Sequence, residues 1–257
     1  MCGICGWIQL NGKTDIQDST ALFEPMTAAL AHRGPDDHGA VVFDDAVLSM
    51  TRLSIIDLDG GQQPIANHEE TCWIVFNGEI YNFSDLRAEL KGRGHRFRSR
   101  SDTEVILCAY EEWGVGCVHR LRGMFAFAIF DCRKNGAARP RLFLARDRLG
   151  KKPLYYYQDA ERLIFGSEIK AILAHAGVRP TVNRDVIPLY LTYGYAPSPL
   201  TFFENIRELP AGHTLLVEDG DVMVRRYWSV PREPCSAPEV SESEYLQQVR
   251  QRFEEAV

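Results

Sequence analysis

Long apolar runs and an excess of basic charge are both missing from this sequence of 257 residues. The longest wholly apolar run, Met124 to Phe130, is far shorter than the roughly 20 residues of a transmembrane helix. The N-terminus has no export signal. The net charge is -6 with both signs interspersed, which argues against a nucleic-acid partner. We therefore expect a cytoplasmic protein with no membrane or nucleic-acid partner.

Internal repeats are also absent, and 20 Gly and 13 Pro are near average usage, which excludes a collagen-like or low-complexity chain. Hydrophobic residues make up 45% of the chain, enough for one or two globular domains. The seven cysteines are an odd number in a chain without an export signal. We therefore expect no disulfide framework, and most cysteines should be small buried residues.

The hydrophobic pattern predicts many short strands with helices grouped between them, and no regular alternation of strand and helix. This favours an α+β protein with stacked antiparallel sheets. The predicted strands are 4–10, 41–43, 47–50, 72–76, 124–130, 142–145, 154–157 and 163–165, and the predicted helices are 22–30, 84–91, 101–110, 167–176 and 184–193.

Three local signals are sharper than the rest. The segment 124–130 is apolar at every position, so it should be a strand buried on both faces. Ser101 to Glu104 form a capping box at the start of a helix. Asn77-Gly78, followed by Ile80-Tyr81, predicts a tight hairpin turn after strand 72–76.

The C-terminal part differs in composition. Residues 231–240 contain three prolines among Ser and Glu and read as a linker. Ser241 to Glu244 are a second capping box, and Tyr245, Val249 and Phe253 recur every four residues. We expect a helix over 241–257 with an apolar stripe that needs a partner or a further domain.

Cys2 follows Met1, and a small residue at position 2 permits removal of the initiator Met. Cys2 would then carry a thiol, with an ordinary pKa of about 8.5, and an α-amine, with one of about 7.7–8.0. The amine could accept the thiol proton at little cost, so one residue would supply both nucleophile and base. Two other interpretations stay open: an incidental cysteine, and a redox or zinc site built on Cys2 and Cys5.

Several blocks, taken together, resemble the glutaminase domain of class II glutamine amidotransferases, in the branch of the glutamine-hydrolysing asparagine synthetases. They are Met1 to Ile4, HRGPDD at 32–37, RLSIID at 52–57, FNGEIYN at 76–82, SDTEVIL at 101–107, FAIFD at 127–131, ARDRLGKKPLYY at 145–156 and FGSEIKAIL at 165–173. The resemblance covers residues 2–230 as one glutaminase domain, and implies that 241–257 is the first helix of a synthetase-like domain.

The resemblance implies a role for each matching residue. Cys2 is the expected nucleophile, and Asn77 and Gly78 form the expected oxyanion hole. Arg52 would bind the α-carboxylate of glutamine and Asp102 its α-ammonium. Main-chain groups of the remaining residues would line the glutamine pocket: Leu53, Ser54, Ile55, Ile56 and Glu79.

The implied fold is a four-layer αββα sandwich of two antiparallel sheets, of the N-terminal nucleophile type. The glutaminase reaction needs no metal or organic cofactor, and ATP and Mg²⁺ are expected only in a synthetase domain. The expected partners are L-glutamine and a synthetase domain or partner protein that accepts ammonia. A homodimer is a further expectation.

Ordinary structural roles compete with these assignments. Asn77-Gly78 could be only a turn, Arg52 a surface ion pair, and Asp102 an acid favoured by a helix dipole. We expect His32 to be structural rather than a base, and Tyr155 to Tyr157 to be sheet packing.

Two features depart from the resembling family. Cys5 stands where the family more often has an aliphatic or aromatic residue, and we predict that Cys2 can be oxidised toward Cys5 if the two come close. No SGGxDS pyrophosphate loop occurs in the chain. The leading hypothesis is therefore a glutaminase without its synthetase half, and the alternative is a non-catalytic glutamine-binding or interaction module.

Overall fold

The computed structural model describes residues 1–11, 16–54, 61–133, 139–231 and 241–254. The chain divides into two compact units, Met1–Tyr227 and Trp228–Val257, and each is described by itself. None of the described helices has both the length and the apolar character that a membrane span needs.

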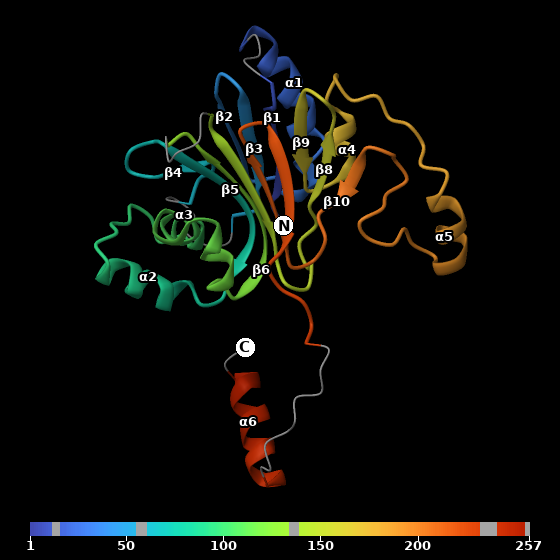
Figure 1. The fold of residues 1–257 in the computed structure, drawn as a ribbon. Coiled ribbons are helices and arrows are strands. Elements are labelled where there is room, and N and C mark those ends of the chain that lie inside the picture. Colours follow the sequence, from blue (N-terminus) through green and yellow to red (C-terminus); the bar gives the residue numbers. More distant parts are fainter. Residues whose placement is uncertain (12–15, 55–60, 134–138, 232–240, 255–257) are drawn as a thin grey trace. The chain divides into compact units, whose positions relative to one another are not determined.

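Two six-stranded sheets, antiparallel throughout, form the centre of the first unit (Figure 1). The first sheet has the order β10-β8-β9-β1-β3-β2, with β1 Gly3–Gln9, β2 Asp37–Val42, β3 Ala46–Arg52, β8 Tyr155–Gln158, β9 Arg162–Gly166 and β10 Ile206–Glu208. The second has the order β12-β11-β7-β6-β5-β4, with β4 Ile65–Ala66, β5 Cys72–Ile80, β6 Gly123–Asp131, β7 Arg141–Arg146, β11 His213–Glu218 and β12 Asp221–Arg226.

Helices cover the outer face of each sheet. On the first sheet lie α1 (Ile16–Ala28) and α4 (Ile169–Leu173), and on the second lie α2 (Phe83–Gly92) and α3 (Asp102–Trp113). One buried cluster fills the space between the sheets, and one lies under each helical layer. The expected α+β sandwich with layers in the order α, β, β, α is therefore confirmed.

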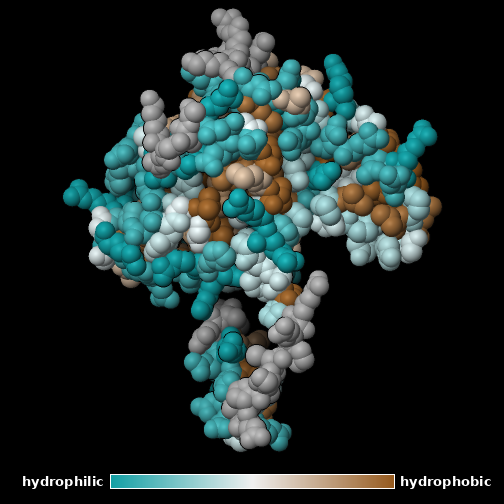
Figure 2. Space-filling model, in the orientation of Figure 1, coloured by the Kyte–Doolittle hydropathy of each residue, from teal (hydrophilic) through white to brown (hydrophobic). Residues whose placement is uncertain are grey.

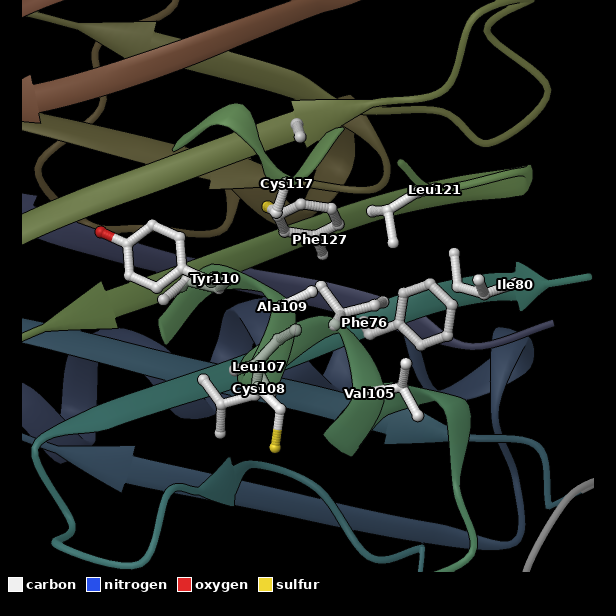
Figure 3. Packing of buried hydrophobic residues seen from close by; sticks show 14 of the residues in the cluster. Phe76, Ile80, Val105, Leu107, Cys108, Ala109, Tyr110, Cys117, Leu121 and Phe127 are labelled. Atoms are coloured by element: carbon white, nitrogen blue, oxygen red, sulfur yellow. The ribbon is translucent and has the colours of Figure 1, made fainter. Parts of the chain in front are cut away.

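Strand β6 carries the apolar run 124–130 and is buried on both faces of the second sheet. Phe125, Phe127 and Ile129 belong to the cluster under α3, in which Figure 3 shows Phe127, while Ala126 and Phe130 belong to the cluster between the sheets. All five side chains are fully buried. The prediction of a strand buried on both faces is confirmed, since period-2 alternation places successive residues in different layers.

The hairpin predicted at Asn77-Gly78 is wrong. Both residues lie inside the continuous strand β5, where Asn77 pairs with Ala126 and Gly78 with Phe125. A β-carbon at Gly78 would stand 2.2 Å from the main-chain oxygen of Met124. The glycine therefore permits close approach of two strands rather than a turn.

Other elements differ mainly at their ends. The helix predicted over 22–30 begins at Ile16 and ends at Ala28, and the helix predicted over 167–176 is only Ile169–Leu173. Strands β4, β10, β11 and β12 were not predicted. The helix predicted over 184–193 is confirmed as α5, Val186–Tyr193. The described residues also form two 3-10 helices, Ala31–Arg33 and Gly114–His119. On α5, Ile187, Tyr190 and Leu191 are exposed and form part of an apolar surface (Figure 2).

The second unit contains α6, Glu242–Glu254. Ser241 and Glu244 form the predicted reciprocal cap: the Glu244 N–H donates to Ser241 Oγ (3.3 Å), and the Ser241 N–H donates to the Glu244 carboxylate (2.9 Å). The predicted stripe of Tyr245, Val249 and Phe253 is exposed. Nearly all of the predicted linker, 232–240, lies outside the described residues.

Candidate active site

A cavity of about 190 Å³ contains most of the predicted site residues. It brings together residues from the ends of both sheets, from the start of α3 and from the loop between β7 and β8. Its lining is Met1, Cys2, Arg52, Leu53, Gly61, Gln63, Phe76, Asn77, Gly78, Glu79, Ser101, Asp102, Thr103, Met124 and Lys152.

One predicted residue lies elsewhere, and two fall outside the described part of the chain. Ser54 is not among the lining residues, and its N–H donates to Asp36 Oδ2 (2.9 Å). Ile55 and Ile56 lie outside the described residues. A larger hollow of about 690 Å³ runs between α1 and β2, but it holds none of the predicted site residues. The smaller cavity is the candidate site because the nucleophile and the opposite charges meet there.

Cys2 is held at the start of β1 by its main chain. Arg33 Nε donates to the Cys2 carbonyl (2.9 Å), and Arg33 Nη1 is paired with Glu168 Oε1 at 2.8 Å. The Cys2 thiol donates to the carbonyl of Leu53 at 3.7 Å, the residue after Arg52. Arg33 and Glu168 lie within the HRGPDD and FGSEIKAIL blocks, but neither was predicted to act at the site. Both blocks thus fix the backbone of the nucleophile.

Cys5 faces away from Cys2. Its sulfur lies 3.9 Å from Thr27 Oγ1, in the cluster between the first sheet and its helices, and burial raises the pKa of the thiol to about 12. Cys2 packs instead against the cluster between the two sheets. The condition set for oxidation of Cys2 toward Cys5, that the two come close, is therefore not met, because their side chains lie on opposite faces of the sheet. The same separation argues against a zinc or redox site built on this pair.

Asn77 and Gly78 present hydrogen-bond donors at the cavity. Asn77 is 1% exposed, and its Nδ2 has no hydrogen-bond partner among the described residues. Along β5, the N–H of Phe76 donates to Gln63 Oε1 and that of Ile80 to Asp102 Oδ2. Since the N–H groups of an antiparallel strand alternate in direction, the Gly78 N–H points to the same edge as these two. A buried amide without a partner is costly unless a ligand satisfies it.

Two carboxylates line the cavity, and burial raises the pKa of both. Burial raises the pKa of Asp102 above the usual range of an aspartate, against hydrogen bonds from main-chain N–H groups that lower it. Burial and the negative charge of Asp102 raise the pKa of Glu79, and the charge of Lys152 opposes this rise. Asp102 is the first residue of α3, and the cap on this helix is its neighbour Ser101, whose side chain accepts the Glu104 N–H.

Two cations line the same cavity. Arg52 is 5% exposed at the end of β3, so it is not the surface ion pair that was the alternative. Lys152 is 6% exposed and was missed as a site residue, although it lies in the ARDRLGKKPLYY block. Asp147 accepts the Lys152 N–H (3.0 Å), and Arg146 Nε donates to the Lys152 carbonyl (2.8 Å). These bonds fix the loop that carries the buried ammonium.

The histidine and tyrosine expectations agree with the structure. His32 contacts Glu168 Oε1 through Nε2 at 3.0 Å and Lys170 through Nδ1 at 3.3 Å, and does not line the cavity. Tyr155 to Tyr157 form β8 and pack within the first sheet.

Comparison with known proteins identifies the class. The chain belongs to the glutamine amidotransferase domain family, whose model matches residues 1–228. The resemblance found in the sequence is thereby confirmed. Among solved structures, glutamine phosphoribosylpyrophosphate amidotransferase from Bacillus subtilis matches with a TM-score of 0.60 and 16% identity, covering 88% of this chain and 49% of that one. At this identity the likeness shows the fold alone.

The curated relatives point to one branch of this family, the glutamine-hydrolysing asparagine synthetases. Asparagine synthetase [glutamine-hydrolyzing] 3 of Bacillus subtilis is 39% identical over 260 residues, which cover 100% of this chain and 41% of the relative. Asparagine synthetase B [glutamine-hydrolyzing] of Escherichia coli is 35% identical over 223 residues, covering 86% of this chain and 34% of the relative. The chain therefore spans between about a third and two fifths of the length of these relatives.

Proposed function

We propose that this chain hydrolyses the side-chain amide of glutamine to glutamate and ammonia through a thioester on Cys2. The observation that carries the proposal is the buried, unpartnered Nδ2 of Asn77 in the cavity that also holds the Cys2 thiol. A donor aimed at the oxygen of an amide is worth about 2.7–4 kcal/mol of activation barrier. Asn77 offers such a donor at every pH, because a side-chain amide does not titrate.

Opposite charges in the same cavity support glutamine as the substrate. Free glutamine is a zwitterion, and Arg52 and Asp102 supply one cation and one anion in the lining. The planar guanidinium of Arg52 matches a carboxylate with two parallel hydrogen bonds. The carboxylate of Asp102 pairs with the α-ammonium group. The remaining length of the substrate then extends toward Cys2.

The reaction has two halves. The Cys2 α-amine, freed by removal of Met1, takes the thiol proton, and the thiolate attacks the amide carbon. The negative charge that develops on the oxygen is stabilised by Asn77 Nδ2 and the Gly78 N–H. The nitrogen takes the proton from the α-ammonium and leaves as ammonia, which yields a glutamyl thioester. Water, deprotonated by the same amine, then releases glutamate and restores the thiol.

The proposed destination of the ammonia is an acceptor domain or partner protein, as in asparagine synthesis. The names of the relatives, which join asparagine synthesis to glutamine hydrolysis, support this step. The chain spans only part of their length, so ATP and Mg²⁺ have no assigned place in the residues described here.

Ammonia release from glutamine by the wild type, Cys2→Ala and Cys132→Ala tests the proposal. Cys132 is an exposed cysteine outside the cavity and serves as the matched control. We expect release to be lost in Cys2→Ala and kept in Cys132→Ala, while Cys2→Ala still binds glutamine in calorimetry. Intact mass should show that Met1 is absent from the active protein. Unchanged release by Cys2→Ala would remove Cys2 from the mechanism.

A further inference from the structure

Three side chains with metal-binding atoms meet outside the glutamine cavity, under the second helical layer. They are His95, which follows the end of α2, and Cys108 and Glu111, which lie three residues apart on α3. One donor atom from each lies within 4.8 Å of the other two. Cys108 is 5% exposed, and in Figure 3 its sulfur points away from Phe127 and Leu121 at the centre of the apolar cluster. The sulfur is thus directed toward the margin of the core.

The three donors lie close to the spacing that one metal ion requires. Bonds of about 2.0–2.3 Å to Zn²⁺ place tetrahedral ligands about 3.3–3.7 Å apart. The donors here need to approach one another by at most about 1.5 Å, which rotation of the His95 and Glu111 side chains can supply. Thiolate, imidazole and carboxylate are together the donor types that Zn²⁺ takes.

A second layer of hydrogen bonds surrounds these donors. His95 Nε2 lies 3.1 Å from Glu112 Oε2, and Asn67 Nδ2 donates to Glu111 Oε1 at 2.7 Å. Metal-binding histidines commonly have one ring nitrogen held by a carboxylate, and metal-binding carboxylates are themselves hydrogen-bonded. Arg93, paired with Glu112 at 3.0 Å, extends the network one step further. These hydrogen bonds therefore hold both side chains beside Cys108, a short rotation away from the arrangement that a metal needs.

We propose that His95, Cys108 and Glu111 form a zinc site, with a water molecule as the fourth ligand and Glu112 and Asn67 as positioning residues. On binding, the Cys108 S–H bond breaks, a sulfur–zinc bond forms and one proton is released to solvent. No electron is transferred. Thiolate and carboxylate together balance the two positive charges of the ion, which favours such a site in a partly buried position.

The site joins the end of α2 to the middle of α3, so its main effect is on stability. A ligand that binds only the folded state raises the free energy of unfolding by mass action. None of the three ligands lines the glutamine cavity, so the inference does not depend on the proposed function. Helix α3 also carries Asp102, so bound zinc would stabilise the helix that positions this residue.

Titration with Co²⁺, a spectroscopic substitute for zinc, tests the site in the full chain carrying Cys2→Ala, which removes the candidate nucleophile as a competing thiol. We expect one equivalent of Co²⁺ to produce a thiolate-to-cobalt absorption band, and Zn²⁺ to displace it and raise Tm. Adding Cys108→Ala should abolish the band. Adding Cys117→Ala, which removes another buried cysteine of the same cluster, should keep it.

A second pair of variants keeps the test decisive if Cys108→Ala fails to fold. His95→Gln changes a partly exposed ligand and should remove tight binding, whereas Glu112→Gln should weaken affinity by about 10-fold to 100-fold with the band preserved. The proposal is overturned if no stoichiometric thiolate band appears. It is also overturned if Cys108→Ala, or folded His95→Gln, binds Co²⁺ as its parent does.

Discussion

At the scale of single residues, Asn77 is the sharpest test of the proposed oxyanion hole. Replacing it with alanine removes a donor that acts mainly in the transition state. We therefore expect kcat to fall by about 100-fold to 1000-fold with little change in KM for glutamine. Steady-state ammonia release measures both constants.

Asn67 is the matched control for Asn77. It is also a buried asparagine, but its side chain is fully engaged: Nδ2 donates to Thr71 and Glu111, and Oδ1 accepts two N–H groups. Asn67→Ala should lower the free energy of unfolding and leave kcat of the folded enzyme nearly unchanged. A raised KM with normal kcat in Asn77→Ala would mean that Asn77 binds the ground state instead.

Asp102 makes glutamine binding depend on pH. Burial raises its pKa, so the carboxyl is protonated at a higher pH than an exposed aspartate. Only the charged form pairs with the α-ammonium, so affinity is complete above the raised pKa and is lost as the pH falls through it. We expect KM to rise on acidification from above the usual aspartate range, as a series of KM values against pH would show.

The variant Asp102→Asn separates this effect from acid unfolding. It should bind glutamine weakly at every pH, and its KM should lose the rise assigned to Asp102. Asp85→Asn changes an exposed aspartate on α2 and should retain the wild-type profile. If Asp102→Asn kept the same rise in KM, another group, with Glu79 first in line, would be the one that titrates.

At the scale of elements, β5 depends on Gly78 for its contact with β6. The β-carbon of Gly78→Ala would meet the Met124 oxygen at 2.2 Å, a main-chain atom that cannot rotate away. Overpacking of this kind costs about 1–3 kcal/mol, so denaturant unfolding should show a loss of at least that size. Ammonia release should fall as well, because Asn77 is displaced with the strand.

Gly92 provides the control for this substitution. It is the last residue of α2, and a β-carbon there would meet no atom within 4 Å. Gly92→Ala should leave stability unchanged or raise it by up to about 1 kcal/mol, since alanine favours a helix more than glycine does. Equal stability of the Gly78→Ala and Gly92→Ala proteins would contradict the assigned close approach.

Strand β5 and the elements around it show what local sequence can and cannot predict. The apolar run 124–130 predicts its own burial, and Ser101 with Glu104 predicts the start of α3, because these signals depend on neighbouring residues. Asn-Gly favours a turn by local preference, but pairing with β6 across more than 40 residues overrides it. Likewise, Lys152 becomes part of the cavity only through the fold of its loop, which local pattern does not encode.

At the scale of the whole molecule, the candidate site requires both sheets. Cys2 and Arg52 belong to the first sheet, and Asn77 and Gly78 to the second, so no single sheet contains the proposed machinery. The family blocks predicted this convergence of residues far apart in sequence. Periodicity alone predicted only stacked sheets, since it carries no information on which strand ends meet.

The second unit should contribute little to the stability of the first. The three apolar clusters are drawn from residues of Met1–Tyr227, and no side chain of α6 is buried. A helix of 13 residues is marginal by itself in water, and its cap and the Arg250–Glu254 pair are local. We expect a chain ending at residue 227 to unfold within about 2 °C of the full chain in calorimetry.

Paired leucine substitutions check the same claim without shortening the chain. Leu246 on α6 is 60% exposed and Leu144 on β7 is fully buried between the sheets. Leu246→Ala should leave the free energy of unfolding nearly unchanged, and Leu144→Ala should lower it by about 2–5 kcal/mol. A comparable loss in both variants, or a fall of more than about 4 °C on truncation, would contradict the expectation that the second unit adds little stability.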